Sequence, residues 1–168
     1  MRTEPPVRRR RLLRPAPRGS GSSGTPSRRR LHERAPRLGG FGLSHVDAEE
    51  LRHALPAGVV CVQNSYSLID RSAEPVLQVC RERDIAWVPY FPLGSGIAGL
   101  PKVTDLPEVQ EVAARLRVTP AQVGLAWLLS RSPQTMLIPG TRDLAHLEEN
   151  LAAGEVILDQ ESLTTLAQ

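Results

Sequence analysis

Short apolar runs alternate with helical segments from residue 40 onward, and this alternation constrains the fold more than any other feature. Val59-Val60-Cys61-Val62-Gln63 is rich in β-branched residues, and a similar run covers residues 85–91. Such runs are typical of strands buried on both faces of a parallel sheet. Shorter runs at residues 40–44 and 135–138 complete a set of four expected strands. Because a helical pattern follows each one, we predict βαβ units and an α/β fold with a parallel sheet.

Helix boundaries are indicated by capping residues. Ser, Thr, Asp or Asn before an apolar-periodic segment accepts hydrogen bonds from the first free backbone amides. Thr119-Pro120-Ala121-Gln122 adds a proline at the first helical position and a capping-box partner at the third. Further helix starts are expected at Asp47, Asp143 and Asp159, and two more helices over residues 74–83 and 106–116.

The first 37 residues differ in composition from the rest of the chain. Residues 1–38 hold 12 arginines and only two acidic residues, whereas residues 39–168 hold nine basic and 16 acidic residues. The early segment also contains six prolines and no aromatic residue, so we predict a disordered basic tail over 1–37 and a folded domain over 38–168. The tail is either a plain disordered extension, which we favour, or a polybasic arm for RNA, DNA or an acidic membrane, whose binding would be non-specific and salt-sensitive.

Other classes of protein are less compatible with this sequence. No apolar run approaches 18 residues, so no membrane-spanning helix is expected. No apolar segment follows the basic N-terminus as in a secretory signal, and a cytoplasmic location is the default expectation. Cys61 and Cys80 lack the spacing of a metal site, so we interpret both as buried reduced thiols.

A phosphate site is predicted where the last apolar run ends. Ile138-Pro139-Gly140-Thr141-Arg142 leads from an expected strand through a tight loop to a helix start. Unpaired amides and the helix dipole favour an anion there. The Thr141 hydroxyl and the Arg142 guanidinium would add donors to the same place.

Four blocks of sequence, in order, resemble the aldo-keto reductases. They are Phe41-Gly42-Leu43-Ser44, Val62-Gln63-Asn64-Ser65-Tyr66-Ser67-Leu68-Ile69-Asp70-Arg71, Val88-Pro89-Tyr90-Phe91-Pro92-Leu93-Gly94-Ser95-Gly96, and Ile138-Pro139-Gly140-Thr141 with the downstream Leu147-Glu148-Glu149-Asn150. The resemblance implies a (β/α)8 barrel that binds NADP(H) at the carboxyl ends of its strands and reduces aldehydes and ketones. Residues 38–168 are similar to the last four β/α units, so the fold expected here is a partial barrel.

The resemblance also implies a role for each matching residue. Ser44 and Gln63 would hydrogen-bond the nicotinamide carboxamide, and the nicotinamide ring would stack on Tyr90. Contacts expected along the rest of the cofactor are, in order, Leu93 and Ser95 at the pyrophosphate, Thr141 and Arg142 at the adenosine 2′-phosphate, and Glu149 and Asn150 at the adenine.

Two binding positions depart from the family pattern. His45 stands where the family usually has Asn, and His146 stands where many members carry Arg over the 2′-phosphate. The family's catalytic Asp, Tyr, Lys and His lie on or after strands that have no counterpart here, and Lys102 is the only lysine. We therefore assign no catalytic residue and expect the isolated chain to be inactive.

Several alternatives stay open at this point. The chain could act with a carbonyl substrate once completed by an N-terminal half-barrel, or pair with a second copy of itself. It could instead be a non-catalytic nucleotide-binding module, or a truncated or mis-started gene product. Binding of nucleic acid through the Arg-rich tail is a further and less favoured hypothesis.

Overall fold

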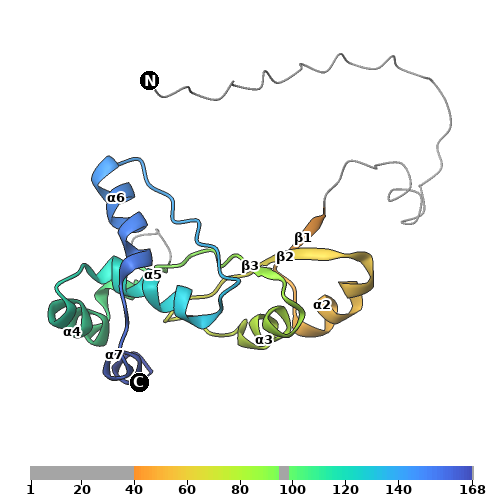
Figure 1. The fold of residues 1–168 in the computed structure, drawn as a ribbon, viewed down its shortest axis with the longest axis horizontal. Helices are drawn as coiled ribbons and strands as arrows, with labels where there is room; N and C mark the ends of the chain where they lie inside the picture. Colours follow the sequence, from red (N-terminus) through yellow and green to blue (C-terminus); the bar gives the residue numbers. More distant parts are fainter. Residues whose placement is uncertain (1–39, 95–98, 168) are drawn as a thin grey trace, which may run out of the picture. The chain divides into compact units, whose positions relative to one another are not determined.

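The computed structural model describes residues 40–94 and 99–167. The predicted tail and Ser95 lie outside these ranges. The described helices and strands follow in the order β1 (Phe41–Ser44), α2 (Ala48–Ala54), β2 (Val59–Gln63), α3 (Glu74–Arg83), β3 (Ala86–Trp87), α4 (Pro107–Leu116), α5 (Pro120–Arg131), α6 (Leu144–Ala152) and α7 (Gln160–Thr165) (Figure 1). Three short 3₁₀ turns are η1 (Leu55–Ala57), η2 (Val103–Asp105) and η3 (Ala153–Glu155). No helix in the described ranges has the length and apolar composition needed to cross a bilayer.

The sheet is parallel, as predicted, and its strands lie in chain order β1-β2-β3. Ser44 at the end of β1 is opposite Gln63 at the end of β2, and Val62 is opposite Trp87 of β3. The carboxyl ends of the strands therefore meet at one edge of the sheet, where the predicted binding residues lie.

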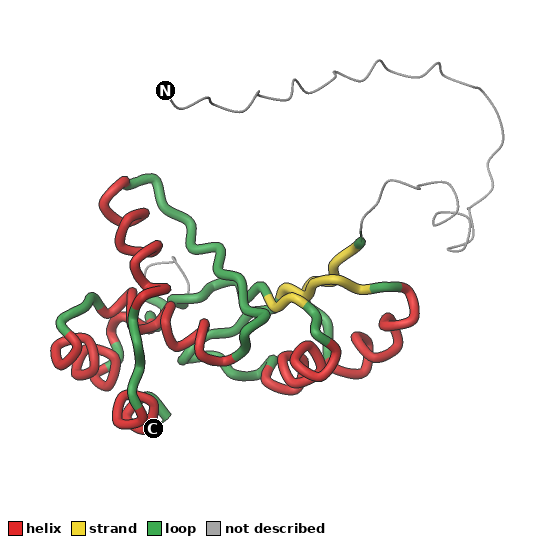
Figure 2. The backbone as a smooth tube through the Cα atoms, in the orientation of Figure 1, coloured by secondary structure: helices red, strands yellow, loops and turns green. Residues whose placement is uncertain are grey.

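The predicted fourth strand over residues 135–138 is reduced to one bridge. Thr135 pairs with Trp87 in parallel, and the Met136 amide donates to the Trp87 carbonyl at 2.8 Å. The rest of the segment is loop (Figure 2), with Met136 57% and Ile138 53% exposed. The described residues provide no strand on its outer side, so a second row of hydrogen bonds does not form.

Two other expectations for the strands are corrected. The strand expected over 85–91 is only two residues long, because Pro89 has no amide hydrogen and Phe91 adopts a left-handed φ of 54°. Burial of β2 on both faces is incomplete: Val59 and Val62, which point to opposite faces, are buried, but Val60 is 49% exposed. α2 and α3 lie on one side of the sheet (Figure 1), and the other side has no such helical layer in the described ranges.

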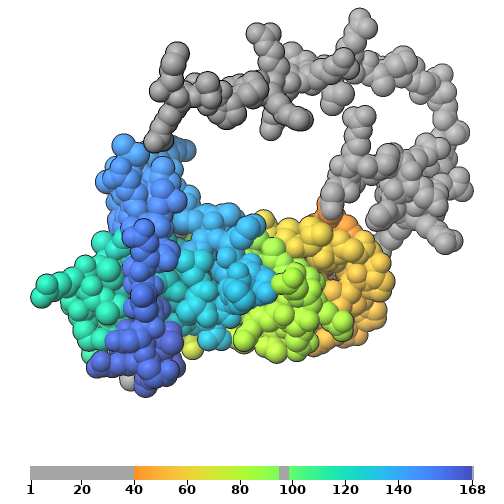
Figure 3. Space-filling view, viewed as in Figure 1, coloured from red at the N-terminus to blue at the C-terminus, as the bar shows by residue number. Residues whose placement is uncertain are grey.

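The predicted helix starts are confirmed. Asp47 and Thr119 both form capping boxes, with Glu50 and Gln122 as the respective third-position partners. Asp143 accepts from the His146 amide, and Asp159 caps α7 in the same way. The chain from η3 to α7 packs against α5 and then α4, and runs over their surface (Figure 3). The two thiols are free, but only Cys80 is fully buried, while Cys61 is half-buried.

An aromatic cluster, which we define as Tyr66, Trp87 and Trp127, forms the centre of the core. Tyr66 is stacked on Trp127 with ring centroids 5.7 Å apart and meets Trp87 edge-on at 5.8 Å. The guanidinium carbons of Arg71 and Arg131 lie 5.1 Å and 5.3 Å from the Trp127 ring centroid. The cluster therefore joins the loop after β2 to β3 and α5.

Some polar groups at the edge of this cluster are paired, whereas Trp87 Nε1 and Arg131 Nε have no hydrogen-bond partner among the described residues. Glu74 of α3 accepts hydrogen bonds from the Tyr66 hydroxyl and from Arg131, the latter at 2.6 Å. Burial, followed by the hydrogen bond to the Glu74 carboxylate, raises the pKa of Tyr66 to about 12. Tyr66 is therefore a structural hydroxyl that stays protonated at neutral pH.

Candidate functional site

The strand ends bring Ser44, Gln63 and Tyr90 together. Ser44 and Gln63 are register partners of neighbouring strands. Tyr90 forms a parallel bridge with Ser65 just beyond β2, and its amide donates to the Asn64 carbonyl at 3.0 Å. A hydroxyl, a carboxamide and a phenol ring thus border one end of the sheet, as the sequence predicted.

His45 occupies the turn between β1 and α2 and contacts this group directly. Its backbone has a left-handed φ of 55°, a conformation in which Asn, Asp and His are enriched among non-glycine residues. Its imidazole Nδ1 lies 3.1 Å from the Tyr90 hydroxyl. The departure from the family pattern at this position therefore introduces a titratable group beside the ring on which the nicotinamide is expected to stack.

Asn64 has a role that sequence reasoning missed. Its buried side chain accepts from the Val46 amide at 3.2 Å and donates to the Val46 carbonyl at 2.7 Å. Both bonds hold the turn that carries His45 against the end of β2. A polar residue immediately after a strand was a visible signal, but its partner lies 18 residues away and could not be named from spacing.

A groove of about 490 Å³ lies beside the strand ends. It is bordered by the loop after Tyr90, by the 138–141 loop and by one side of α6. Its lining includes five of the predicted site residues: Leu93, Thr141, His146, Glu149 and Asn150. Phe91 lines it too and meets Tyr90 edge-on with centroids 5.2 Å apart, so the groove continues from the strand-end group.

The start of α6 is already capped by the protein. The Thr141 hydroxyl accepts from the Asp143 amide at 3.1 Å, and the Asp143 carboxylate accepts from the His146 amide at 3.0 Å. That backbone hydrogen bond lowers the pKa of Asp143 below its usual value. An anion bound here would gain the Thr141 hydroxyl and His146 but would lie near a carboxylate.

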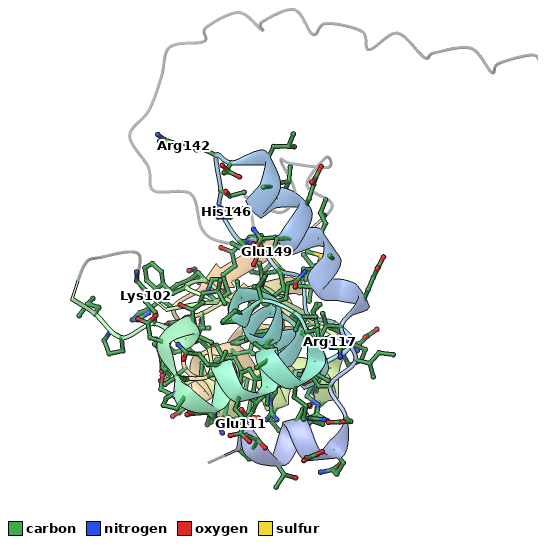
Figure 4. The ribbon with its side chains drawn as sticks, turned by 90° about the vertical axis from the view of Figure 1, so that its left-hand side faces the viewer. Lys102, Glu111, Arg117, Arg142, His146 and Glu149 are labelled. Carbon is green, nitrogen blue, oxygen red and sulfur yellow. The ribbon has the colours of Figure 1, made fainter. Side chains whose placement is uncertain are left out.

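Arg142, just before α6, and Glu149, within it, point in different directions. Arg142 is exposed and extends outward from the start of α6 (Figure 4). Glu149 is on the inner side, where its carboxylate accepts a hydrogen bond from the Thr119 hydroxyl and its carbonyl accepts from Gln122 at 3.2 Å. Thus Glu149 ties α6 to the N-terminus of α5, an arrangement that its sequence position did not reveal.

These features define the class of the protein: part of a parallel β/α barrel with its candidate site at the carboxyl ends of the strands. The chain belongs to the aldo/keto reductase family, whose model matches residues 37–168. It is 45% identical over 127 residues to pyridoxine 4-dehydrogenase of Escherichia coli K12, a match that covers 75% of this chain and 43% of that relative. The chain spans less than half the length of the curated relatives it matches.

Solved structures show the same relationship. A thermostable aldo-keto reductase in complex with the inhibitor epalrestat aligns with a TM-score of 0.71 at 29% identity, covering 82% of this chain and 51% of that one. An aldo-keto reductase from Klebsiella pneumoniae in complex with NADPH aligns with a TM-score of 0.67 at 26% identity, over 76% and 46% of the two chains. The predicted family and partial-barrel fold are therefore confirmed.

Proposed function

We propose that this chain is the cofactor-binding part of an NADP(H)-dependent oxidoreductase that acts on aldehydes or ketones in the cytoplasm. The observation that carries the proposal is the continuous run of predicted binding residues from the Ser44–Gln63 pair through Tyr90 into the groove. The Klebsiella pneumoniae relative in complex with NADPH supports the choice of cofactor.

The chemistry of the groove fits the cofactor in most places. Ser44 and Gln63 offer a hydroxyl and an amide for a carboxamide, and Tyr90 offers a ring face. Thr141 and His146 would meet the 2′-phosphate, with Asn150 toward the adenine. The Asp143 carboxylate is unfavourable, because it lies at the helix start where the phosphate charge is expected.

The bound cofactor would supply the hydride, and residues of this chain would hold and orient the cofactor. Reduction of a carbonyl also requires a proton donor. The buried Tyr66 hydroxyl is bonded to Glu74, and Tyr90 is expected to stack on the cofactor ring rather than to donate a proton. We therefore propose that these 168 residues bind NADP(H) without reducing carbonyl compounds by themselves, and that completion of the barrel is required for turnover.

Replacing Tyr90 with alanine is expected to weaken NADPH binding by about 5- to 150-fold, since an aromatic stacking platform contributes about 1–3 kcal/mol per base. The measurement is a titration that follows NADPH fluorescence. Phe41→Ala is the matched control, because Phe41 is an aromatic residue at the start of β1, at the other end of the strand from Ser44 and the candidate site. Absence of NADPH binding by the unmodified chain at millimolar concentration would refute the proposed function. Oxidation of NADPH with a nitrobenzaldehyde substrate, abolished by Tyr90→Ala, would refute the proposed inactivity.

We also propose that the open sheet associates with a second copy or with an N-terminal half-barrel. β1 and the 135–138 segment each lack a partner on one side within the described residues, and such edges promote pairing.

A dimer is accordingly expected in size-exclusion chromatography with light scattering at micromolar concentration. Met136→Glu should shift the protein to a monomer, because it places a charge on the exposed edge. Ile157→Glu is the control, since Ile157 is exposed but lies in the connection between η3 and α7. A monomeric unmodified chain that gains no mass when mixed with an N-terminal half-barrel of a relative would contradict this proposal.

A further inference from the structure

The imidazole of His45 and the hydroxyl of Tyr90 form a hydrogen-bonded pair at the strand ends, with Nδ1 and the oxygen 3.1 Å apart. His45 is exposed, so it exchanges protons with the solvent. Either partner can donate: the phenol to a neutral imidazole, or a protonated imidazole to the phenol oxygen. The pair therefore persists in both states, while the charge beside the Tyr90 ring changes from zero to positive.

We propose that His45 makes the chain discriminate between the reduced and oxidised cofactor in a pH-dependent way. This inference rests on the proposed function, in which the nicotinamide ring lies on Tyr90. The oxidised nicotinamide ring is positively charged, whereas the reduced ring is neutral. A protonated His45 repels only the oxidised ring, so the preference for NADPH over NADP⁺ increases as the pH falls.

The other charged groups near His45 do not produce the same effect. Asp47 and Glu50 line the same hollow as His45 at the start of α2, and both accept hydrogen bonds from backbone amides in the capping box of that helix. Carboxylates ordinarily titrate below pH 5, whereas histidine titrates between pH 5 and 8. Asn64, Ser65, Ser72 and Gln63, which also surround the turn, carry no ionisable group in this range, and Asp70, which accepts from Ser65 and Ser72, is a further carboxylate.

His146 is the other histidine in the candidate site, and it serves as an internal control. It lines the groove at the expected position of the 2′-phosphate, a group that NADPH and NADP⁺ share. Its protonation would strengthen the binding of both forms equally and would cancel in the ratio of their dissociation constants. A pH-dependent ratio therefore reports on His45 and not on His146.

The effect is expected to be moderate, because His45 is exposed. Interactions between exposed charges contribute about 0.2–1 kcal/mol, which corresponds to a change of about 1.4- to fivefold in affinity. The ratio of the Kd for NADP⁺ to the Kd for NADPH should rise by this factor between pH 8.0 and pH 6.0 at fixed ionic strength.

The test is a pair of calorimetric titrations, with NADPH and with NADP⁺, at both pH values. His45→Asn should abolish the pH dependence of the ratio while preserving the fold, because Asn also tolerates the left-handed conformation at this position. His146→Asn should keep the pH dependence of the ratio. Binding of both forms with a constant ratio, or a pH-dependent ratio that survives in His45→Asn, would overturn this inference alone. Failure of both forms to bind would instead refute the proposed function.

Discussion

Replacing Trp127 with alanine is expected to reduce the free energy of unfolding by about 3–5 kcal/mol, the range observed for truncation of large buried aromatic residues. The loss would exceed that of a simple cavity, because the Trp127 ring stacks on Tyr66 and lies under the guanidinium groups of Arg71 and Arg131. Urea denaturation followed by far-UV circular dichroism measures the change.

Leu151→Ala provides the comparison for this variant. Leu151 is an apolar helical residue, but its side chain lies mostly in solvent, so the expected change is within about 0.5 kcal/mol. A loss below about 1 kcal/mol for Trp127→Ala would show that the aromatic cluster is not the centre of the folded core.

Replacing Glu74 with alanine is expected to reduce the free energy of unfolding by about 1–2 kcal/mol at pH 7. Hydrogen bonds to charged groups contribute about 1.5–3 kcal/mol, and the partial exposure of both Glu74 and Arg131 reduces this value. Glu82→Ala is the matched control on the same helix, since Glu82 is exposed and accepts from Gln78 four residues earlier at 3.1 Å. The loss for that variant should stay below about 0.5 kcal/mol.

The contribution of Glu74 should also disappear in acid. Burial alone would raise the pKa of Glu74, but the hydrogen bonds from Tyr66 and Arg131 outweigh burial, so its pKa lies below its usual value. A carboxylate with a lowered folded-state pKa stabilises the protein above its unfolded-state pKa, and the stabilisation is lost as the pH falls through the folded-state value. Unfolding of Glu74→Ala should therefore depend less on pH between 7 and 3 than unfolding of the unmodified chain. Equal pH dependence in the two proteins would contradict this assignment.

Much of the fold could be predicted because its signals are local. The capping box of Thr119 and Gln122 forms as expected, and Asp47, expected as an N-cap, forms a second box with Glu50. The lengths of the strands could not be predicted in the same way, because a strand also depends on its neighbour. Residues 135–138 have a suitable apolar composition, yet they pair on one side only and form a single bridge.

In the candidate site, too, features set by local sequence could be predicted, whereas contacts between distant segments could not. The proximity of Ser44 and Gln63 follows from parallel pairing, since each directly ends its own strand. The contact of Glu149 with Thr119, 30 residues earlier, requires the packing of α6 on α5, which no local pattern specifies. The His45–Tyr90 pair likewise joins residues 45 positions apart through the geometry of the sheet.

The hydrogen bond from Arg71 to the Leu166 carbonyl, at 2.8 Å, has a consequence for the order of folding. It joins residues 95 positions apart, whereas the ring contacts between Tyr66 and Trp87 span a much shorter loop. Closing a longer loop costs more chain entropy, so long-range contacts tend to form after shorter ones. α7 is therefore expected to dock last, onto α4 and Arg71, after the aromatic cluster has assembled, and to detach first when the protein begins to unfold.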